Sequence, residues 1–328
     1  MRPLLRLLLL AAVAAAAVLL SLRLGAVRLG VGEVVDALRG RGDPAAVAIV
    51  QRLRLPRSVL AAMVGGSLGA SGAAFQALLR NPLAEPYILG VSGGAAVGAV
   101  GAIVLGFSAP SGAGTAIAAF GGAILAILLV LRLAGSVGRA LDTRVLLLSG
   151  VVIGAFFNAV ILLALTFADL ESFRSALFWM MGSAAGATWR EIGVLAAAAV
   201  PALAVLLALA RPLNLLAVGE ETAAYLGVRT ERVKLAAYAA ASLLAASAVA
   251  VAGVIGFVGL VVPHVVRILW GADHRFLLPA SVLLGATFLV LADALARTAA
   301  APTELPIGVV TAFVGVPFFL WILRRRGA

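Results

Sequence analysis

The sequence predicts an all-α, polytopic membrane protein with about ten transmembrane helices, and three observations support that prediction. Hydrophobic residues make up 63% of the 328-residue chain and charged residues only 12%, whereas proteins average about 25% charged residues. Several charge-free stretches are long enough to cross a bilayer. These stretches are rich in Gly, Ala and Ser, the small residues that let membrane helices approach one another closely.

The charge-free stretches define the predicted spans, because a helix needs about 20 apolar residues to cross about 30 Å of hydrocarbon. Two stretches are too long for one span. Residues 86–131 divide at Pro110-Ser111-Gly112. Residues 235–266 carry Gly253, Gly256, Gly259 and Pro263, which divide them into a span near 235–254 and a shorter segment near 256–270. The stretches are 7–22, 58–79, 86–131, 145–168, 192–210, 235–266, 276–292 and 305–323. The resulting even number of spans places both termini on one side, predicted to be the cytoplasmic side.

The basic residues support this orientation only modestly. More of them fall on the predicted cytoplasmic side than outside, in the direction of the positive-inside rule. An outer group runs against the rule and comprises Arg39, Arg41, Arg52, Arg54 and Arg57. At the start of the chain, Arg2, Arg6 and an alanine-rich run imitate a secretory signal peptide. The further spans downstream favour an uncleaved first helix over that reading.

The sequence indicates no catalytic group, bound cofactor or metal site. A phosphate-binding P-loop needs G-x-x-x-x-G-K-[ST], but the only lysine, Lys234, follows Val233. The chain has no cysteine, and the spacing of its two histidines, His264 and His274, matches no metal motif. The net charge of +11 comes mostly from scattered arginines without interleaved aromatic residues, which argues against nucleic acid binding.

A hydrophilic segment at 211–234 separates two predicted spans on the cytoplasmic side. Glu220 and Glu221 suit the first turn of a short helix, and Gly227 suits its C-terminal end. The segment is either a solvated loop or a coupling element that contacts a cytoplasmic ATPase.

Few ionisable residues lie inside the predicted spans. Asp293 and Arg297 are four residues apart near the end of the ninth span, so they can pair along one helix face. Such residues are functional candidates by default, although a self-paired couple at a span end is an equal alternative. The Met- and aromatic-rich segment 173–182 after the fifth span either lines a substrate path or packs against neighbouring helices.

Several motifs in order resemble the FecCD-type permease family, the transmembrane subunits of bacterial ABC importers for ferric siderophores, haem and vitamin B12. The motifs are Arg54-Leu55-Pro56-Arg57, Asn81-Pro82-Leu83-Ala84-Glu85-Pro86, the Gly-Val-Ser-Gly-Gly of 90–94, Trp179-Met180-Met181-Gly182, Gly219-Glu220-Glu221, the glycine-rich run 256–264, Leu291-Ala292-Asp293 and Glu304-Leu305-Pro306 with the five residues after it. The resemblance covers most of the chain.

The resemblance implies a single transmembrane permease domain, residues 1–328, in the bacterial cytoplasmic (inner) membrane. Such a permease pairs with a second copy, sits on two ATP-binding subunits that hold ATP and Mg²⁺, is surrounded by lipid, and receives cargo from an external substrate-binding protein. The expected cargo is a metal chelate, a ferric siderophore or haem, moved by alternating access. The alternatives are vitamin B12 and, from another class, an ion-coupled secondary transporter. The latter would need several buried carboxylates, of which only Asp293 is a candidate.

The resemblance also implies three groups of functional residues. Docking of the binding protein is expected at an outer elbow, residues 39–57, through Arg54 and Arg57 together with Arg297. A guanidinium suits this role because it forms a bidentate fork with carboxylate; the alternative is that these arginines anchor helix ends. Contact with the ATPase is expected at Gly219, Glu220, Glu221 and Thr222. The translocation path is expected at Asn158, Leu162, Thr166, Phe173, Trp179, Met180 and Met181.

Overall fold

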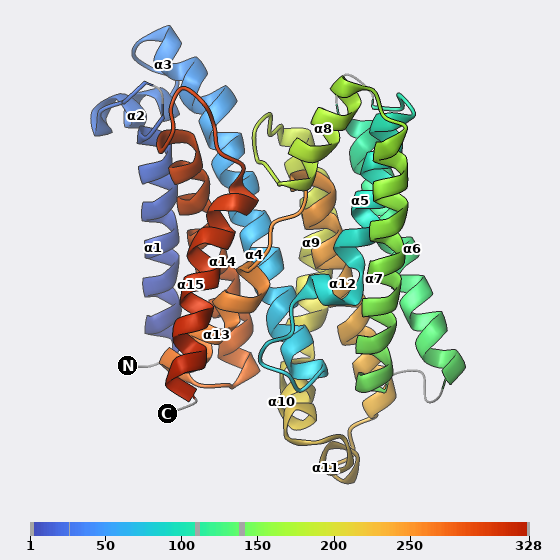
Figure 1. The fold of residues 1–328 in the computed structure, drawn as a ribbon. Helices are drawn as coiled ribbons and strands as arrows, with labels where there is room; N and C mark the ends of the chain where they lie inside the picture. The colour runs from blue at the N-terminus through green and yellow to red at the C-terminus, as the bar shows by residue number, and fades with distance from the viewer. Residues whose placement is uncertain (1–2, 26, 109–111, 138–141, 327–328) are drawn as a thin grey trace.

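The computed structural model describes residues 3–25, 27–108, 112–137 and 142–326, and these residues form helices and connecting segments without strands (Figure 1). Seven described helices are long and apolar enough to span a membrane, and three shorter apolar helices accompany them. The long ones are α1 (Pro3–Arg23), α4 (Leu55–Leu78), α6 (Ala113–Val137), α7 (Thr143–Thr166), α9 (Trp189–Ala208), α12 (Thr230–Ala252) and α14 (His274–Thr298). The shorter ones are α5 (Val91–Val104), α13 (Val258–Trp270) and the apolar part Ile307–Leu320 of α15 (Ile307–Arg326). The predicted all-α, ten-span architecture is therefore confirmed.

Short helices connect the spans at both ends of the bundle. They are α2 (Val31–Leu38), α3 (Pro44–Ala48), the π-helical turn η1 (Ile49–Arg54), the 3₁₀ turn η2 (Pro86–Leu89), α8 (Leu170–Met180), α10 (Ala210–Val218) and α11 (Glu220–Tyr225). In Figure 1, α2, α3 and α8 lie at one end, whereas α10 and α11 lie at the other end, where α1 begins and α15 ends. We call the first end the outer end and the second the inner end.

Helices α4 and α12 form the centre of the bundle, and most of each is buried. Helix α4 packs against α14, α12 and α13, whereas most of α1, α6, α7 and α9 faces outward. Glycines allow the close crossings. A Cβ atom added at Gly65 would collide with the carbonyl oxygen of Gly285, and one added at Gly72 would collide with that of Gly259. The small residues thus pack backbone against backbone, as expected where lipid offers no hydrophobic drive.

The start of α4 differs from the sequence expectation. The sequence predicted an elbow at residues 39–57 before a span at 58–79, but one continuous helical segment runs from Pro44 to Leu78. A proline ring normally clashes with the carbonyl four residues before it, and the wider π-helical turn at Ile49–Arg54 directly precedes Pro56. Such a turn accommodates the clash without a break. The chain reverses earlier, between α2 and α3, where Gly40 and Gly42 adopt positive φ.

The long stretch 235–266 breaks where the glycines predicted. Helix α12 ends at Ala252 and α13 begins at Val258, and Gly253 adopts a φ of +70°. At this break, backbone groups lack helical hydrogen-bond partners. Two side chains from the connection before α5 form hydrogen bonds with them instead. Glu85 Oε1 accepts a 2.6 Å hydrogen bond from the Phe257 backbone N–H, and the Tyr87 hydroxyl donates a 2.8 Å bond to the Ile255 carbonyl. The other predicted division, at Pro110 and Ser111, lies outside the described residues.

The cysteine-free sequence permits a direct test of topology. Single cysteines at Ser136 and Glu220, both near the inner end, are expected to react with a membrane-impermeant maleimide only from the cytoplasm. Cysteines at Gly42 and Ser172, near the outer end, are expected to react only from outside. The measurement is labelling of intact cells against inverted vesicles. Labelling of Glu220→Cys in intact cells would contradict the cytoplasmic placement of both termini.

Candidate functional site

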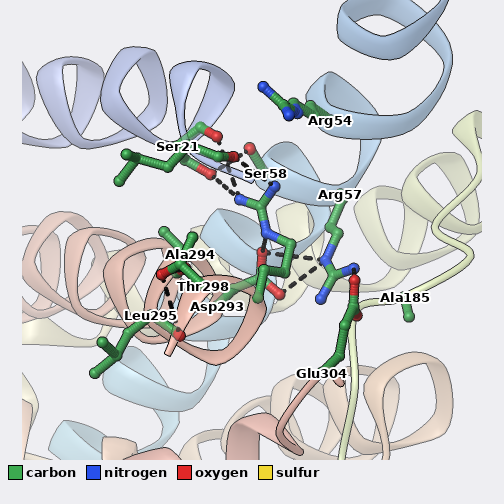
Figure 2. A network of polar contacts seen from close by, with 12 residues as sticks. Ser21, Arg54, Arg57, Ser58, Ala185, Asp293, Ala294, Leu295, Thr298 and Glu304 are labelled. Atoms are coloured by element: carbon green, nitrogen blue, oxygen red, sulfur yellow. Dashed lines mark hydrogen bonds and ion pairs between the residues drawn. The ribbon is translucent and has the colours of Figure 1, made fainter. Parts of the chain in front are cut away.

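Four charged side chains at the outer end form an ion network that joins α4, α14 and the connection from α14 to α15. Arg57 Nε lies 2.9 Å from Asp293 Oδ1, and Arg57 Nη1 lies 2.8 Å from Glu304 Oε2. Arg297 Nε lies 3.1 Å from the other oxygen of Asp293. Figure 2 shows Arg57 between the two carboxylates. We call Arg57, Asp293, Arg297 and Glu304 the outer ion network.

Two of the three arginines predicted to dock a partner bind the C-terminal end of α1 instead of facing solvent. Arg54 Nη1 donates hydrogen bonds to the carbonyls of Leu22 and Arg23 at 2.8 and 3.2 Å. Arg297 Nη2 donates to Ser21, at 2.6 Å to its hydroxyl and 3.3 Å to its carbonyl. Cations are stabilising there because the last carbonyls of a helix lack partners and carry partial negative charge. Arg54 and Arg297 therefore fix α1 against α4 and α14.

Some arginines at the outer end remain accessible to a partner. Arg54 and Arg297 are only 6% and 7% exposed, whereas Arg39, Arg41 and Arg52 of the elbow (residues 39–57) are exposed. Arg57 is partly accessible beside Glu304. Docking through Arg54, Arg57 and Arg297 stays a prediction. The geometry favours docking of the binding protein through Arg57 and the exposed arginines of the elbow.

The predicted coupling segment forms α10 and α11, which project at the inner end (Figure 1). Glu220 bends back to the bundle, because its carboxylate lies 3.0 Å from Lys234 Nζ and 4.0 Å from Arg80 Nη2. Lys234 is almost fully buried at the start of α12. The predicted glutamate and threonine on the other side of α11, Glu221 and Thr222, are exposed. Glu220 thus braces α11 against α12 and the turn that follows α4, and its neighbours form the outward surface.

Apolar side chains complete that outward surface. Val218, Tyr225 and Leu226 are 74%, 91% and 63% exposed, although all three lie outside the apolar spans. Beside them, a cavity of about 590 Å³ is lined by Arg80, Asp142, Thr143, Arg144, Gly219, Glu220, Glu221, Thr222, Ala224, Thr230, Glu231 and Lys234. A projecting helix with exposed apolar side chains is the kind of surface that a partner subunit covers.

The residues predicted to line the path fall into two groups. On α7, Asn158, Leu162 and Thr166 are four residues apart and share one exposed face. At the end of α8, Met180 and Met181 line an apolar cavity of about 570 Å³ together with the α12–α13 break and α15. Trp179 is half-buried and Phe173 is exposed on α8. The α7 residues do not line this cavity, and their role in transport stays a prediction.

Helix α8 begins at a well-defined cap near the outer end. Asp169 Oδ1 accepts a 2.9 Å hydrogen bond from the backbone N–H of Ser172. This bond and a second one from the Ser172 hydroxyl hold the pKa of the Asp169 carboxyl below its usual value. The cap therefore stays ionised and keeps the start of α8 fixed at neutral pH.

Comparison with known proteins identifies the family. The model of the FecCD transport family matches residues 11–325. The chain belongs to this family. Its relatives include the cobalamin import system permease protein BtuC of Halobacterium salinarum, 48% identical over 85% of this chain and 74% of that protein. The vitamin B12 import system permease protein BtuC of an Escherichia coli strain is 42% identical over 87% of this chain and 86% of that protein.

A solved structure has the same fold. An inward-facing metal-chelate type ABC transporter superposes with a TM-score of 0.88 and 32% identity, over 97% of this chain and 98% of that one. As a FecCD permease, the chain is therefore an ABC importer permease and a multi-pass protein of the cytoplasmic membrane.

Sequence reasoning found part of this FecCD site. The four-residue spacing predicted the Asp293–Arg297 pair, which is confirmed at 3.1 Å. The contacts of Arg57 with Asp293 and Glu304 were missed, because those partners are 236 and 247 residues away in the chain. The brace at Glu220 was missed as well. Its signal was Lys234, the only lysine of the chain, 14 residues after Glu220.

Proposed function

We propose that the chain is the membrane-spanning subunit of an ATP-driven importer for a metal chelate. It would work as a pair of copies on two ATP-binding subunits and receive cargo from an external binding protein. The observation that supports this proposal most is the FecCD match across residues 11–325, together with the same fold in a metal-chelate type transporter. The chain itself would hydrolyse no ATP, and ATP and Mg²⁺ would bind to the partner subunits.

The proposed mechanism is alternating access, with each end of the chain contacting a different partner. At the inner end, the exposed side of α11 would contact the ATP-binding subunits and move with them when they close. Glu220 would pass that motion to α12 and α4 through Lys234 and Arg80. Because α12 and α4 lie at the centre of the bundle, their displacement would change the cavity beside Met180 and Met181. The outer end would receive the loaded binding protein.

An ion-coupled secondary transporter fits the geometry less well. Such a transporter needs a carboxylate that exchanges protons or cations. Asp293 is fully buried, and two guanidinium groups hold its oxygens. Glu85, a second carboxylate in the described part of the bundle, accepts a hydrogen bond from the backbone of the α12–α13 break. Both groups therefore have structural partners.

Among metal chelates, we propose cobalamin as the first cargo to test and ferric siderophores or haem as the second. The order follows the two relatives at 48% and 42% identity, which are both described as cobalamin or vitamin B12 importers. The wider metal-chelate class is favoured by the solved structure with the TM-score of 0.88.

Uptake in a deletion strain tests the cargo. A cobalamin-requiring strain without this permease is expected to lose growth on nanomolar cyanocobalamin and to regain it with the wild-type gene. Growth on a ferric siderophore or on haem as sole iron source is the parallel measurement in the same strain. Normal cobalamin growth combined with a defect on an iron chelate would contradict the cobalamin assignment and favour the second cargo.

A further inference from the structure

The two carboxylates that hold Arg57 differ in how easily they can leave it. The Asp293 side chain is completely buried, whereas the Glu304 side chain is 47% exposed. Both bind the guanidinium with two oxygens, Asp293 at Nε and Glu304 at Nη1. Loss of Asp293 would leave the buried Arg297 and the mostly buried Arg57 facing each other, but Glu304 can swing into water. Glu304 is therefore the exchangeable partner of Arg57.

Glu304 lies on a short connection that leads to the apolar cavity. Three residues after it, α15 begins with two backbone hydrogen bonds to the end of α8. The Ile307 N–H donates to the Gly182 carbonyl at 3.1 Å, and the Gly308 N–H donates to the Met181 carbonyl at 3.0 Å. Met181 and Gly308 both line the cavity of about 570 Å³. Glu304 therefore lies four residues before Gly308 of the cavity wall, and between them the Leu305 N–H donates a 3.0 Å hydrogen bond to the Ala296 carbonyl of α14.

We propose that Glu304 is an internal competitor for the docking site on Arg57. A carboxylate of the external binding protein replaces Glu304 on Arg57 Nη1, and the released connection loosens the contact between α15 and α8. Glu304 is thus a positioning residue that links docking outside to the cavity inside. The inference rests on the proposed function, because it requires a binding protein that docks at the outer end.

The exchange is feasible because it replaces one carboxylate by another. The guanidinium keeps its charge and its fork geometry, and Asp293 holds it in place throughout. Ion pairs open to water contribute little, and the Glu304 side of this pair is open to water, so the Glu304 contact is weak enough to be displaced. It is also strong enough to reduce the affinity for an incoming carboxylate by up to about 5-fold. The exposed Arg39, Arg41 and Arg52 of the elbow offer further guanidinium groups to carboxylates of the partner.

The first test measures access to the cavity in the absence of the external binding protein. A single cysteine at Met181 reports access to the cavity in the purified permease bound to its ATP-binding subunits. With Glu304→Gln, its reaction with a water-soluble maleimide is expected to quicken several-fold, whereas Glu304→Asp is expected to restore the slow rate. Glu171→Gln, an equal change of charge at an exposed residue of α8, is the matched control and is expected to leave the rate unchanged. Equal rates in the wild type and Glu304→Gln would overturn the proposal.

The second test measures docking of the importer's own binding protein to the same complex. Glu304→Gln is expected to lower its Kd by about 3- to 5-fold, corresponding to about 0.7–1 kcal/mol. Glu171→Gln is expected to change the Kd much less. Arg57→Met separates the inference from the docking assignment. If Arg57→Met weakens binding but Glu304→Gln does not change it, Arg57 docks the partner and the competition proposal is wrong. If Arg57→Met binds as the wild type does, docking through Arg57 is wrong and the competition proposal is overturned with it.

Discussion

Replacing Asp293 with leucine is expected to destabilise the protein by about 3–5 kcal/mol and to abolish uptake. Removal of one partner from a buried ion pair leaves an uncompensated charge, and this loss has that typical magnitude. Here the side chain is fully buried and lies between Arg57 and Arg297, so the variant leaves two like charges together. Thermal unfolding of the purified permease and its yield in the membrane are the measurements.

A double variant tests whether the charge itself is responsible. Asp293→Leu combined with Arg297→Leu removes both charges and leaves Arg57 paired with Glu304. Well-packed apolar replacements for a whole ion pair are often near neutral, so the double variant is expected to be more stable than Asp293→Leu alone. With Arg297→Leu measured as well, the deviation of the double variant from the sum of the two single effects gives the coupling energy of the pair. A double variant as unstable as the sum of the two single ones would contradict the account of the outer ion network.

Replacing Gly219 with proline is expected to uncouple ATP hydrolysis from uptake while leaving insertion intact. Gly219 precedes α11 with a φ of 161°, which proline cannot adopt because its ring fixes φ near −65°. The change also removes the N–H that bonds to the Leu215 carbonyl. Because the site lies outside the apolar spans, stability is expected to change little. ATP hydrolysis and cargo uptake are measured together in reconstituted vesicles.

Two further variants at this position and its neighbour sharpen the test. Gly219→Ala is the matched control, since extended backbone accepts any residue and a Cβ there meets its nearest atom at 3.7 Å. It is expected to remain coupled. Glu221→Arg, which replaces a carboxylate in the first turn worth about 0.3–1 kcal/mol, is expected to uncouple in part through the exposed side of α11. Full coupling in both Gly219→Pro and Glu221→Arg would remove the grounds for the coupling assignment.

The fold could be predicted from local signals in the sequence. Charge-free stretches gave the spans, and glycines at 253 and 256 marked the break in the long stretch that now separates α12 from α13. The start of α4 could not be predicted in this way. A proline in a sequence indicates a bend, but whether a π-helical turn absorbs it depends on the packing around that turn.

The candidate site also contains contacts that the sequence could predict and contacts that it could not. A pair on one helix, Asp293 and Arg297, follows from helical spacing alone. The partners of Arg54 do not, because they are backbone carbonyls of α1, which carry no residue-type signal. The resemblance pointed to Arg54 as a docking group, yet its burial shows that a motif position identifies an important residue without giving its contacts.

ATP-dependent uptake in vesicles tests the central claim most directly. The permease is reconstituted with its ATP-binding subunits, and cyanocobalamin is supplied with the external binding protein. The account predicts uptake only when ATP, the ATP-binding subunits and the binding protein are all present, with no effect of an imposed proton or sodium gradient. Uptake by the permease alone, driven by such a gradient, would contradict it.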